Sequence, residues 1–177
     1  MVRGASVFGR ARKLHAEQRS SVSEAGAAIR AGGEFYVDDF AYRLVAVEQE
    51  EEAAARLIAR FAGTNVEVVR GDAAALGYPD ATFDTVATCT MLHHVPTRAL
   101  QDKVLAEAFR VLRAGGTFLG SDSLPSDDLH KFHEGDTYNP VEPAGFLTRL
   151  QTVGFATITL HVSYNLVFTA RKGEDSP

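Results

Sequence analysis

Two carboxylates lie where the sequence predicts the ends of neighbouring strands. Glu48 directly follows the apolar run 44–47, and Asp72 follows the run 66–69 after Gly71. A carboxylate offers two acceptor oxygens, which suit the two hydroxyls of a ribose or the amine of an adenine. Each acid also has a structural interpretation, Glu48 as an acid in the first turn of a helix and Asp72 as a turn residue. Their pairing favours a nucleoside site at the edge of a sheet.

A second polar group follows the third predicted strand. Cys89 lies between Thr88 and Thr90, and His93 and His94 come shortly after. A nucleophilic Cys89 would need a lowered thiol pKa, for which the sequence has no signal, so we expect a small buried thiol. The histidines could form a general base or a metal pair. Adjacent residues on a helical turn point in different directions, so we expect no metal site. One histidine is expected to pack, and His94 to line the mouth of the substrate pocket.

Asp122 follows the fourth predicted strand, residues 117–120. It could line the substrate cleft or bind a metal, whereas a solvated loop acid is the commoner role. We place Asp122 with His94 as a candidate for the substrate pocket.

These positions depend on an alternation of strands and helices. Apolar runs and helical stripes predict strands at 44–47, 66–69, 83–89, 117–120, 155–161 and 163–170, and helices at 50–61, 100–112 and 144–150. The polar stretch 123–143 is expected to cross a strand end as a loop. Strands that alternate with helices indicate an α/β fold with a doubly wound, mostly parallel sheet, and the last two strands add an antiparallel edge.

Composition limits the class of protein. The chain has 177 residues, 45% of them hydrophobic and 23% charged, with a net charge of −5. This size and composition predict one globular domain over 41–172, an irregular or helical arm over 1–40 and a tail over 173–177. An acidic chain without an apolar leader or a long apolar run is not expected to bind nucleic acid or membrane. The single cysteine leaves no internal disulfide, so we expect a cytoplasmic protein.

Several phrases in this order resemble one family. They are Ala46-Val47-Glu48, Val68-Val69-Arg70-Gly71-Asp72-Ala73, Tyr78-Pro79-Asp80-Ala81-Thr82-Phe83-Asp84, Met91-Leu92-His93-His94-Val95 and Val111-Leu112-Arg113-Ala114-Gly115-Gly116-Thr117. Over residues 44–171 the chain resembles class I S-adenosylmethionine-dependent methyltransferases of the small-molecule type, which have a Rossmann-like fold. The resemblance implies methyl transfer from S-adenosylmethionine to a small-molecule acceptor.

The resemblance also implies roles for individual residues. Glu48 would hold the ribose hydroxyls, with Gln49 near the adenine. Asp72 would accept from the adenine amine, and the backbone N–H of Ala73 would donate to the ring. Backbone groups of residues 88–90 would approach the methionine end of the cofactor. A sulfonium is a strong leaving group, so orientation of acceptor and methyl supplies much of the catalysis, and no catalytic acid–base pair is assigned.

One family motif is missing from the sequence. A glycine-rich loop is expected about 20 residues before the acid, but residues 26–33 contain no GxG and follow no buried strand. The first strand of the family's sheet therefore has no counterpart in the pattern, and binding of the methionine end of the cofactor loses support. The alternative to an enzyme is a catalytically inactive methyltransferase-like binding or assembly module, truncated or completed by a partner chain. An incomplete sheet edge also favours a homodimer.

Overall fold

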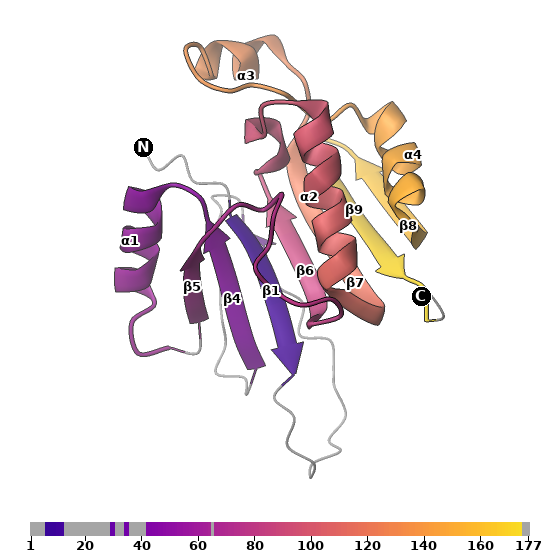
Figure 1. The fold of residues 1–177 in the computed structure, drawn as a ribbon. Coiled ribbons are helices and arrows are strands. Elements are labelled where there is room, and N and C mark those ends of the chain that lie inside the picture. Colours follow the sequence, from indigo (N-terminus) through magenta and orange to yellow (C-terminus); the bar gives the residue numbers. More distant parts are fainter. Residues whose placement is uncertain (1–5, 13–28, 31–33, 36–41, 65, 175–177) are drawn as a thin grey trace.

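The computed structural model describes residues 6–12, 29–30, 34–35, 42–64 and 66–174, which form a mixed sheet with helices packed against it (Figure 1). The seven-stranded sheet has the order β5-β4-β1-β6-β7-β9-β8. Its strands are β1 (Ser6–Arg12), β4 (Tyr42–Glu48), β5 (Val66–Arg70), β6 (Phe83–Cys89), β7 (Leu112–Ser123), β8 (Phe155–Val162) and β9 (Asn165–Lys172). A separate pair consists of β2 (Ile29–Arg30) and β3 (Glu34–Phe35).

The strand directions determine which residues meet at one edge. β4 pairs in parallel with β5, and β6 pairs in parallel with β7. β9 is antiparallel to β7 and to β8, as the alternating C-terminal sequence predicted. The structure therefore confirms an open α/β sheet with an antiparallel C-terminal edge. The carboxyl ends of β4, β5, β6 and β7 lie at the same edge, where α/β sheets bind their ligands.

Helices cover the sheet and enclose its main core. They are α1 (Glu51–Arg60), α2 (Arg98–Val111), α3 (Asp127–Phe132) and α4 (Pro143–Val153), with a 3₁₀ turn, η1 (Leu92–His94). α2 packs on β7 and on α4, and α4 packs on β8. Phe118, Phe146 and Phe168 are fully buried between these helices and the sheet, with ring centroids 5.0 Å apart from Phe168 to each of the other two. A smaller cluster around Ala46 and Ala87 lies apart from this core.

Two elements differ from the sequence prediction. The arm 1–40, expected to be irregular or helical, contributes β1 to the centre of the sheet, so the sheet does not lack a strand between β4 and β6. Its sequence, Ser-Val-Phe-Gly-Arg-Ala-Arg, has no continuous apolar run and contains a glycine, which explains why the pattern did not reveal it. The second difference is α3, which lies in the stretch expected to be a loop. Ser126 caps it by accepting from the backbone N–H of Leu129 at 3.1 Å.

β1 runs antiparallel to both of its neighbours. Ser6 pairs with Glu48 and Val7 pairs with Thr88, so the chain enters β1 at the carboxyl edge and leaves it at the opposite edge. A parallel strand in this position would instead deliver its following loop to the carboxyl edge. The predicted degenerate loop at 26–33 lies largely outside the described residues.

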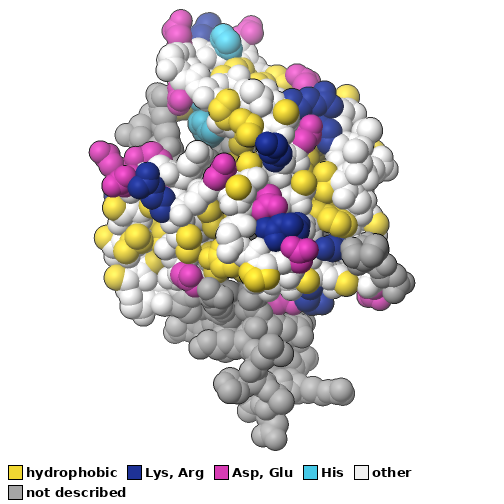
Figure 2. All heavy atoms as spheres, viewed as in Figure 1, with side chains coloured by type: hydrophobic (Ala, Val, Ile, Leu, Met, Phe, Trp, Pro, Cys, Tyr) yellow, Lys and Arg dark blue, Asp and Glu magenta, His cyan; other side chains and the backbone are white. Residues whose placement is uncertain are grey.

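The surface visible in Figure 2 carries charges of both signs. On the face that carries α2, Lys and Arg side chains are interspersed with Asp and Glu side chains (Figure 2). Among the helices of the described residues, none has both the length and the apolar character that crossing a bilayer requires.

Candidate functional site

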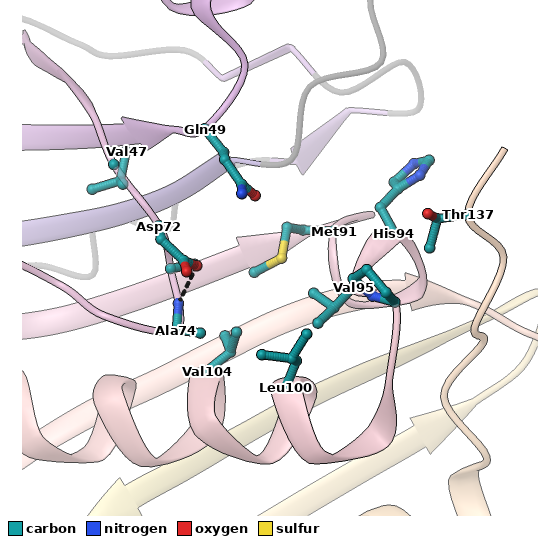
Figure 3. Close-up of a pocket in the computed structure, with 13 residues that line it drawn as sticks. Val47, Gln49, Asp72, Ala74, Met91, His94, Val95, Leu100, Val104 and Thr137 are labelled. Carbon is teal, nitrogen blue, oxygen red and sulfur yellow. Dashed lines mark hydrogen bonds between the residues drawn. The ribbon is translucent and has the colours of Figure 1, made fainter.

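A cavity of about 330 Å³ lies at the carboxyl ends of β4, β5 and β6 (Figure 3). Its size falls at the lower end of the range of about 300–1,000 Å³ typical of small-molecule sites. The lining combines strand ends, the turn after β6 and the start of α2: Val47, Gln49, Gly71, Asp72, Ala73, Ala74, Met91, His94, Val95, Pro96, Leu100, Val104 and Thr137. This composition, mostly apolar with a few polar groups, suits a planar base with hydroxyls attached.

Asp72 and Gln49 bring polar groups to this cavity from adjacent strand ends. In Figure 3 both side chains extend into the same space, across from Met91. Asp72 Oδ1 accepts a hydrogen bond of 2.8 Å from the backbone N–H of Ala74, which fixes the carboxylate in the turn after β5. Gly71 lets the backbone of this turn lie close to the Val47 side chain, since a Cβ at position 71 would lie a tight 3.3 Å from Val47 Cγ1. Gln49, Asp72 and Ala73 therefore line one cavity.

Glu48 lies next to the cavity but does not line it. Its backbone carbonyl accepts from the N–H of Gly71 at 3.0 Å, which ties the ends of β4 and β5 together. Its carboxylate is 1% exposed and accepts from the N–H of Glu50 at 3.0 Å. Side chains alternate along a strand, so Val47 and Gln49 face the cavity while Glu48 points elsewhere. The backbones of Glu48 and Asp72 lie close together, because Gly71 bonds to Glu48. Of the two side chains, however, that of Asp72 lines the cavity and that of Glu48 does not.

Residues 88–90 follow β6 at the same edge of the sheet. Thr88 is buried, and its Oγ1 has no hydrogen-bond partner among the described residues. Cys89 is partly buried, and this burial raises the pKa of its thiol, in agreement with a packing role. Thr90 has a positive φ of 48°, rare for a non-glycine residue, and its N–H donates to the Ser121 carbonyl at 2.8 Å. Thr90, the residue that follows β6, is thus held in an uncommon backbone conformation at the carboxyl edge of the sheet.

The two adjacent histidines have different surroundings. His93 is buried, and its Nδ1 lies 2.6 Å from Oδ1 of the buried Asp122. Asp122 also accepts from the N–H of Leu92 at 2.8 Å, so its carboxylate holds η1 in place and does not line the cavity. His94 does line the cavity, and burial, followed by its neighbours His93 and His133, lowers its pKa. His94 and Asp122 were both expected at the substrate pocket. His94 lines the cavity, whereas Asp122 does not.

A hydrogen-bond network around Arg110 was not predicted from the sequence. Arg110 of α2 donates to the carbonyls of Leu76 and Tyr78 at 2.9 and 2.7 Å and to Asp80 at 2.8 Å. It also pairs with Glu107, whose other oxygen accepts from the N–H of Leu76 at 2.7 Å. This network fastens the loop that continues from Asp72 to α2. An (i, i+3) charge pair on a helix is common on surfaces, which is why its role was not apparent.

Among the described residues, Asp72, Gln49 and the apolar wall of the cavity suit the adenosine of S-adenosylmethionine. The start of β1 pairs with Glu48 and Thr88 at the same edge of the sheet. Most of residues 26–33, where the glycine-rich loop was expected, lie outside the described residues.

Comparison with known proteins supports the same assignment. The family model described as "Methyltransferase domain" matches residues 25–120. A "Probable S-adenosylmethionine-dependent methyltransferase" of Mycolicibacterium smegmatis is 31% identical over 141 residues, which are 76% of this chain and 51% of that protein. A fatty-acid O-methyltransferase of the same organism is 36% identical over 77 residues, 44% of this chain and 27% of that protein. The chain therefore spans about half, or less, of the length of these relatives.

Solved structures show the same fold. An S-adenosylmethionine-dependent methyltransferase from Thermotoga maritima superposes with a TM-score of 0.60 at 19% identity, over 72% of each chain. A phosphoethanolamine N-methyltransferase from Haemonchus contortus, in complex with S-adenosyl-L-methionine, gives a TM-score of 0.57 at 14% identity, over 72% of this chain and 42% of that one.

Proposed function

The chain belongs to the family of methyltransferase domains, and from this premise we propose that it transfers a methyl group from S-adenosylmethionine to a small-molecule acceptor. The observation that carries the proposal is the cavity at the carboxyl ends of β4, β5 and β6, into which Asp72 and Gln49 extend (Figure 3). The resemblance assigned both residues to the adenosine, and both line this space. The start of α2 supplies its apolar wall, with Leu100 and Val104.

The residues of this chain would bind and orient the reactants. When bound, S-adenosylmethionine supplies an activated methyl group on a sulfonium. We propose that Asp72 accepts from the adenine amine and that the N–H of Ala73 donates to the ring, with Gln49 alongside. Residues 88–90 lead toward the methionine end. Catalysis then consists mainly of holding acceptor and methyl in line in a cavity that excludes water, so the site needs no strong catalytic base.

The acceptor would approach from the side of His94. This residue lines the cavity, and η1 holds it beside the polar segment that contains α3. We propose His94 as an acceptor-facing residue and Asp122 as the residue that positions η1, through Leu92 and His93. Glu48 would contribute to the ribose only if its carboxylate turned from its contact with the N–H of Glu50. The acidic composition and the single cysteine favour action in the cytoplasm.

A second candidate function is a catalytically inactive binding or assembly module, including one completed by a partner chain or a second copy of this chain. The antiparallel β1 is the observation that favours it, because its last residue, Arg12, pairs with Tyr42 at the edge opposite the carboxyl ends of β4 and β6. Such a module would bind the adenosine without catalysing transfer.

Product formation separates the two functions. The purified chain is incubated with S-adenosylmethionine and a panel of phenols, carboxylates and amines, and S-adenosylhomocysteine is quantified. We expect acceptor-dependent product that falls at least tenfold in Asp72→Ala and not in Asp128→Ala, a variant of an exposed acid on α3. Binding of the cofactor without product for any acceptor would favour the inactive module.

A further inference from the structure

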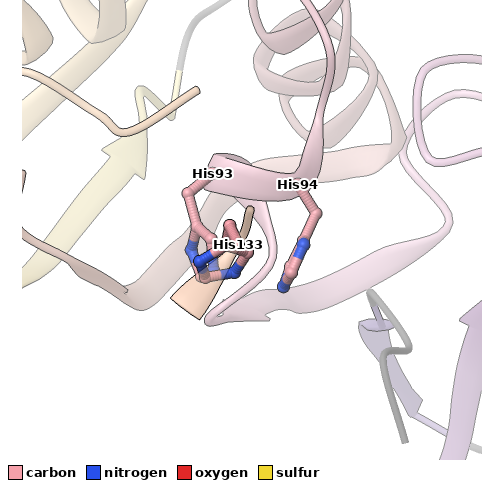
Figure 4. A group of neighbouring side chains, drawn as sticks. All are labelled: His93, His94 and His133. Carbon is pink, nitrogen blue, oxygen red and sulfur yellow. The ribbon is translucent and has the colours of Figure 1, made fainter. Parts of the chain in front are cut away.

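Three imidazoles lie close together beside the cavity, and that of His94 lines it (Figure 4). His93 and His94 come from η1, and His133 is the residue that ends α3. The ring centroids of His93 and His94 lie 4.2 Å apart, and each lies 5.1 Å from that of His133. One nitrogen from each ring can be chosen so that all three lie within 4.8 Å of one another.

Hydrogen bonds fix the tautomers of the two buried rings. Nδ1 of His93 lies 2.6 Å from the Asp122 carboxylate, which can only accept, so Nδ1 carries the proton. Nδ1 of His133 lies 2.8 Å from the carbonyl oxygen of Leu129, which also can only accept. The neutral forms of both rings therefore keep a lone pair on Nε2. A ligating histidine typically donates its other N–H to a carboxylate or carbonyl in this way.

The third ring, that of His94, lines the cavity and lies close to the other two. A neutral imidazole offers a lone pair, which a metal ion requires. The cluster thus brings one nitrogen donor from each of three rings together.

From this geometry we propose that His93, His94 and His133 bind one divalent transition-metal ion of the zinc type. Three imidazole nitrogens with an open fourth position are the donor set of many zinc sites. Tetrahedral zinc with Zn–N of about 2.1 Å requires nitrogens about 3.4 Å apart, so nitrogens at the 4.8 Å limit must approach each other by about 1.4 Å. Because His94 also lines the cavity, the fourth position would be within reach of a ligand held there.

The proposal revises the expectation that adjacent histidines cannot share an ion. That expectation assumed α-helical geometry, in which neighbouring side chains diverge. Residues 92–94 instead form a single 3₁₀ turn, and the rings of His93 and His94 are tilted by only 39°. The sequence could not reveal His133, which lies 39 residues after His94 in a segment expected to be a loop.

A packing role is the alternative. The ring of His133 stacks on Tyr138 at a centroid distance of 5.3 Å and an angle of 27°, so the cluster could exist for aromatic contacts alone. Titration with metal distinguishes the two roles directly, and it uses no methyl donor, so its outcome is independent of the proposed function.

The test is isothermal titration of the metal-free chain with Zn²⁺, together with the visible absorption of a Co²⁺-loaded sample. We expect one ion per chain with micromolar or tighter affinity, and the intense Co²⁺ absorption of a tetrahedral nitrogen site. His94→Ala, whose ring is only half-buried, should weaken binding at least tenfold. His161→Ala, a variant of an exposed histidine on β8, should bind as the wild type does.

The absence of saturable Zn²⁺ binding to the wild type would overturn the proposal. Equal affinities for wild type and His94→Ala would also overturn it, because the ion would then lie elsewhere. Should His94→Ala fail to fold, the Co²⁺ spectrum of the wild type decides: an octahedral, weakly absorbing ion contradicts a three-histidine site.

Discussion

Gly120 of β7 pairs with Thr88 of β6, and the two backbones are so close that a Cβ at Gly120 would lie 2.5 Å from the Thr88 carbonyl oxygen. The same Cβ would lie 2.6 Å from Thr88 Oγ1 and 2.7 Å from Phe168 Cζ. Backbone cannot move aside as a flexible side chain can, so this position requires glycine.

Gly120→Ala should therefore destabilise the fold. Overpacking in a close-packed core typically costs about 1–3 kcal/mol, and urea unfolding should show a loss in the free energy of unfolding of at least this size. Gly77→Ala is the matched control, because a Cβ at Gly77 meets nothing within 4 Å. Equal stabilities of the two variants would show that β6 and β7 are farther apart than described.

Asp122 supports the turn that carries both histidines. Asp122→Ala would leave the N–H groups of Leu92 and His93 buried without their acceptor. Each unpaired buried donor costs about 1–3 kcal/mol, so we expect a loss of roughly 2–5 kcal/mol in urea unfolding. Asp128→Ala, at an exposed position, should change stability by less than about 0.5 kcal/mol. A loss no larger in Asp122→Ala would mean that η1 does not depend on this carboxylate.

Glu107 makes stability depend on pH. Its hydrogen bond with Arg110 is the main reason that the pKa of Glu107 is lowered in the folded chain. The folded state then binds fewer protons than the unfolded state, so the stabilisation is complete above the unfolded glutamate pKa of about 4.3. It is lost as pH falls through the lower folded value.

The measurement is urea unfolding of wild type and Glu107→Gln across acidic and neutral pH. The wild type should be more stable at pH 7, by about 0.5–1.5 kcal/mol since the pair with Arg110 is partly exposed, and the difference should shrink below about pH 4.3. Glu134→Gln, which removes an exposed acid, is the control for the change of charge and should alter stability at pH 7 by less than about 0.5 kcal/mol. A difference that grows on acidification would reverse the sign argued here.

Cys89 should react slowly. Burial raises the pKa of its thiol, and the thiolate is the reactive form. A thiol reagent at pH 7 should modify the native chain at least tenfold more slowly than the urea-unfolded chain, which supplies the control because Cys89 is the single cysteine. Comparable native and unfolded rates would indicate an accessible, activated thiol and would reopen a nucleophilic role.

Much of the sheet could be predicted because buried parallel strands have sequences of consecutive apolar residues. The prediction of 83–89 coincides with β6, and the C-terminal alternation predicted β8 and β9. The strand β1 could not be predicted in this way, because its position depends on pairing with β4 and β6, which are distant in the sequence. The seven residues of β1 also do not indicate whether the strand runs parallel or antiparallel to its neighbours.

The candidate site was predicted to the level of strand ends but not of side-chain directions. Asp72 and Gln49 line the cavity at the carboxyl ends of β4 and β5 because both come shortly after predicted strands. The burial of the Glu48 carboxylate depends on its contact with the N–H of Glu50, and the Arg110 network depends on helix α2 reaching across to the loop. Such contacts join residues through space, so a one-dimensional pattern does not contain them.

The most direct test of the account is isothermal titration of the chain with S-adenosylhomocysteine. We predict saturable binding of one molecule per chain, weakened at least tenfold by Asp72→Ala, since loss of a charged acceptor costs about 1.5–3 kcal/mol, and unchanged by Asp128→Ala. An absence of heat at millimolar ligand, or equal affinities of wild type and Asp72→Ala, would contradict an adenosine site at the ends of β4 and β5.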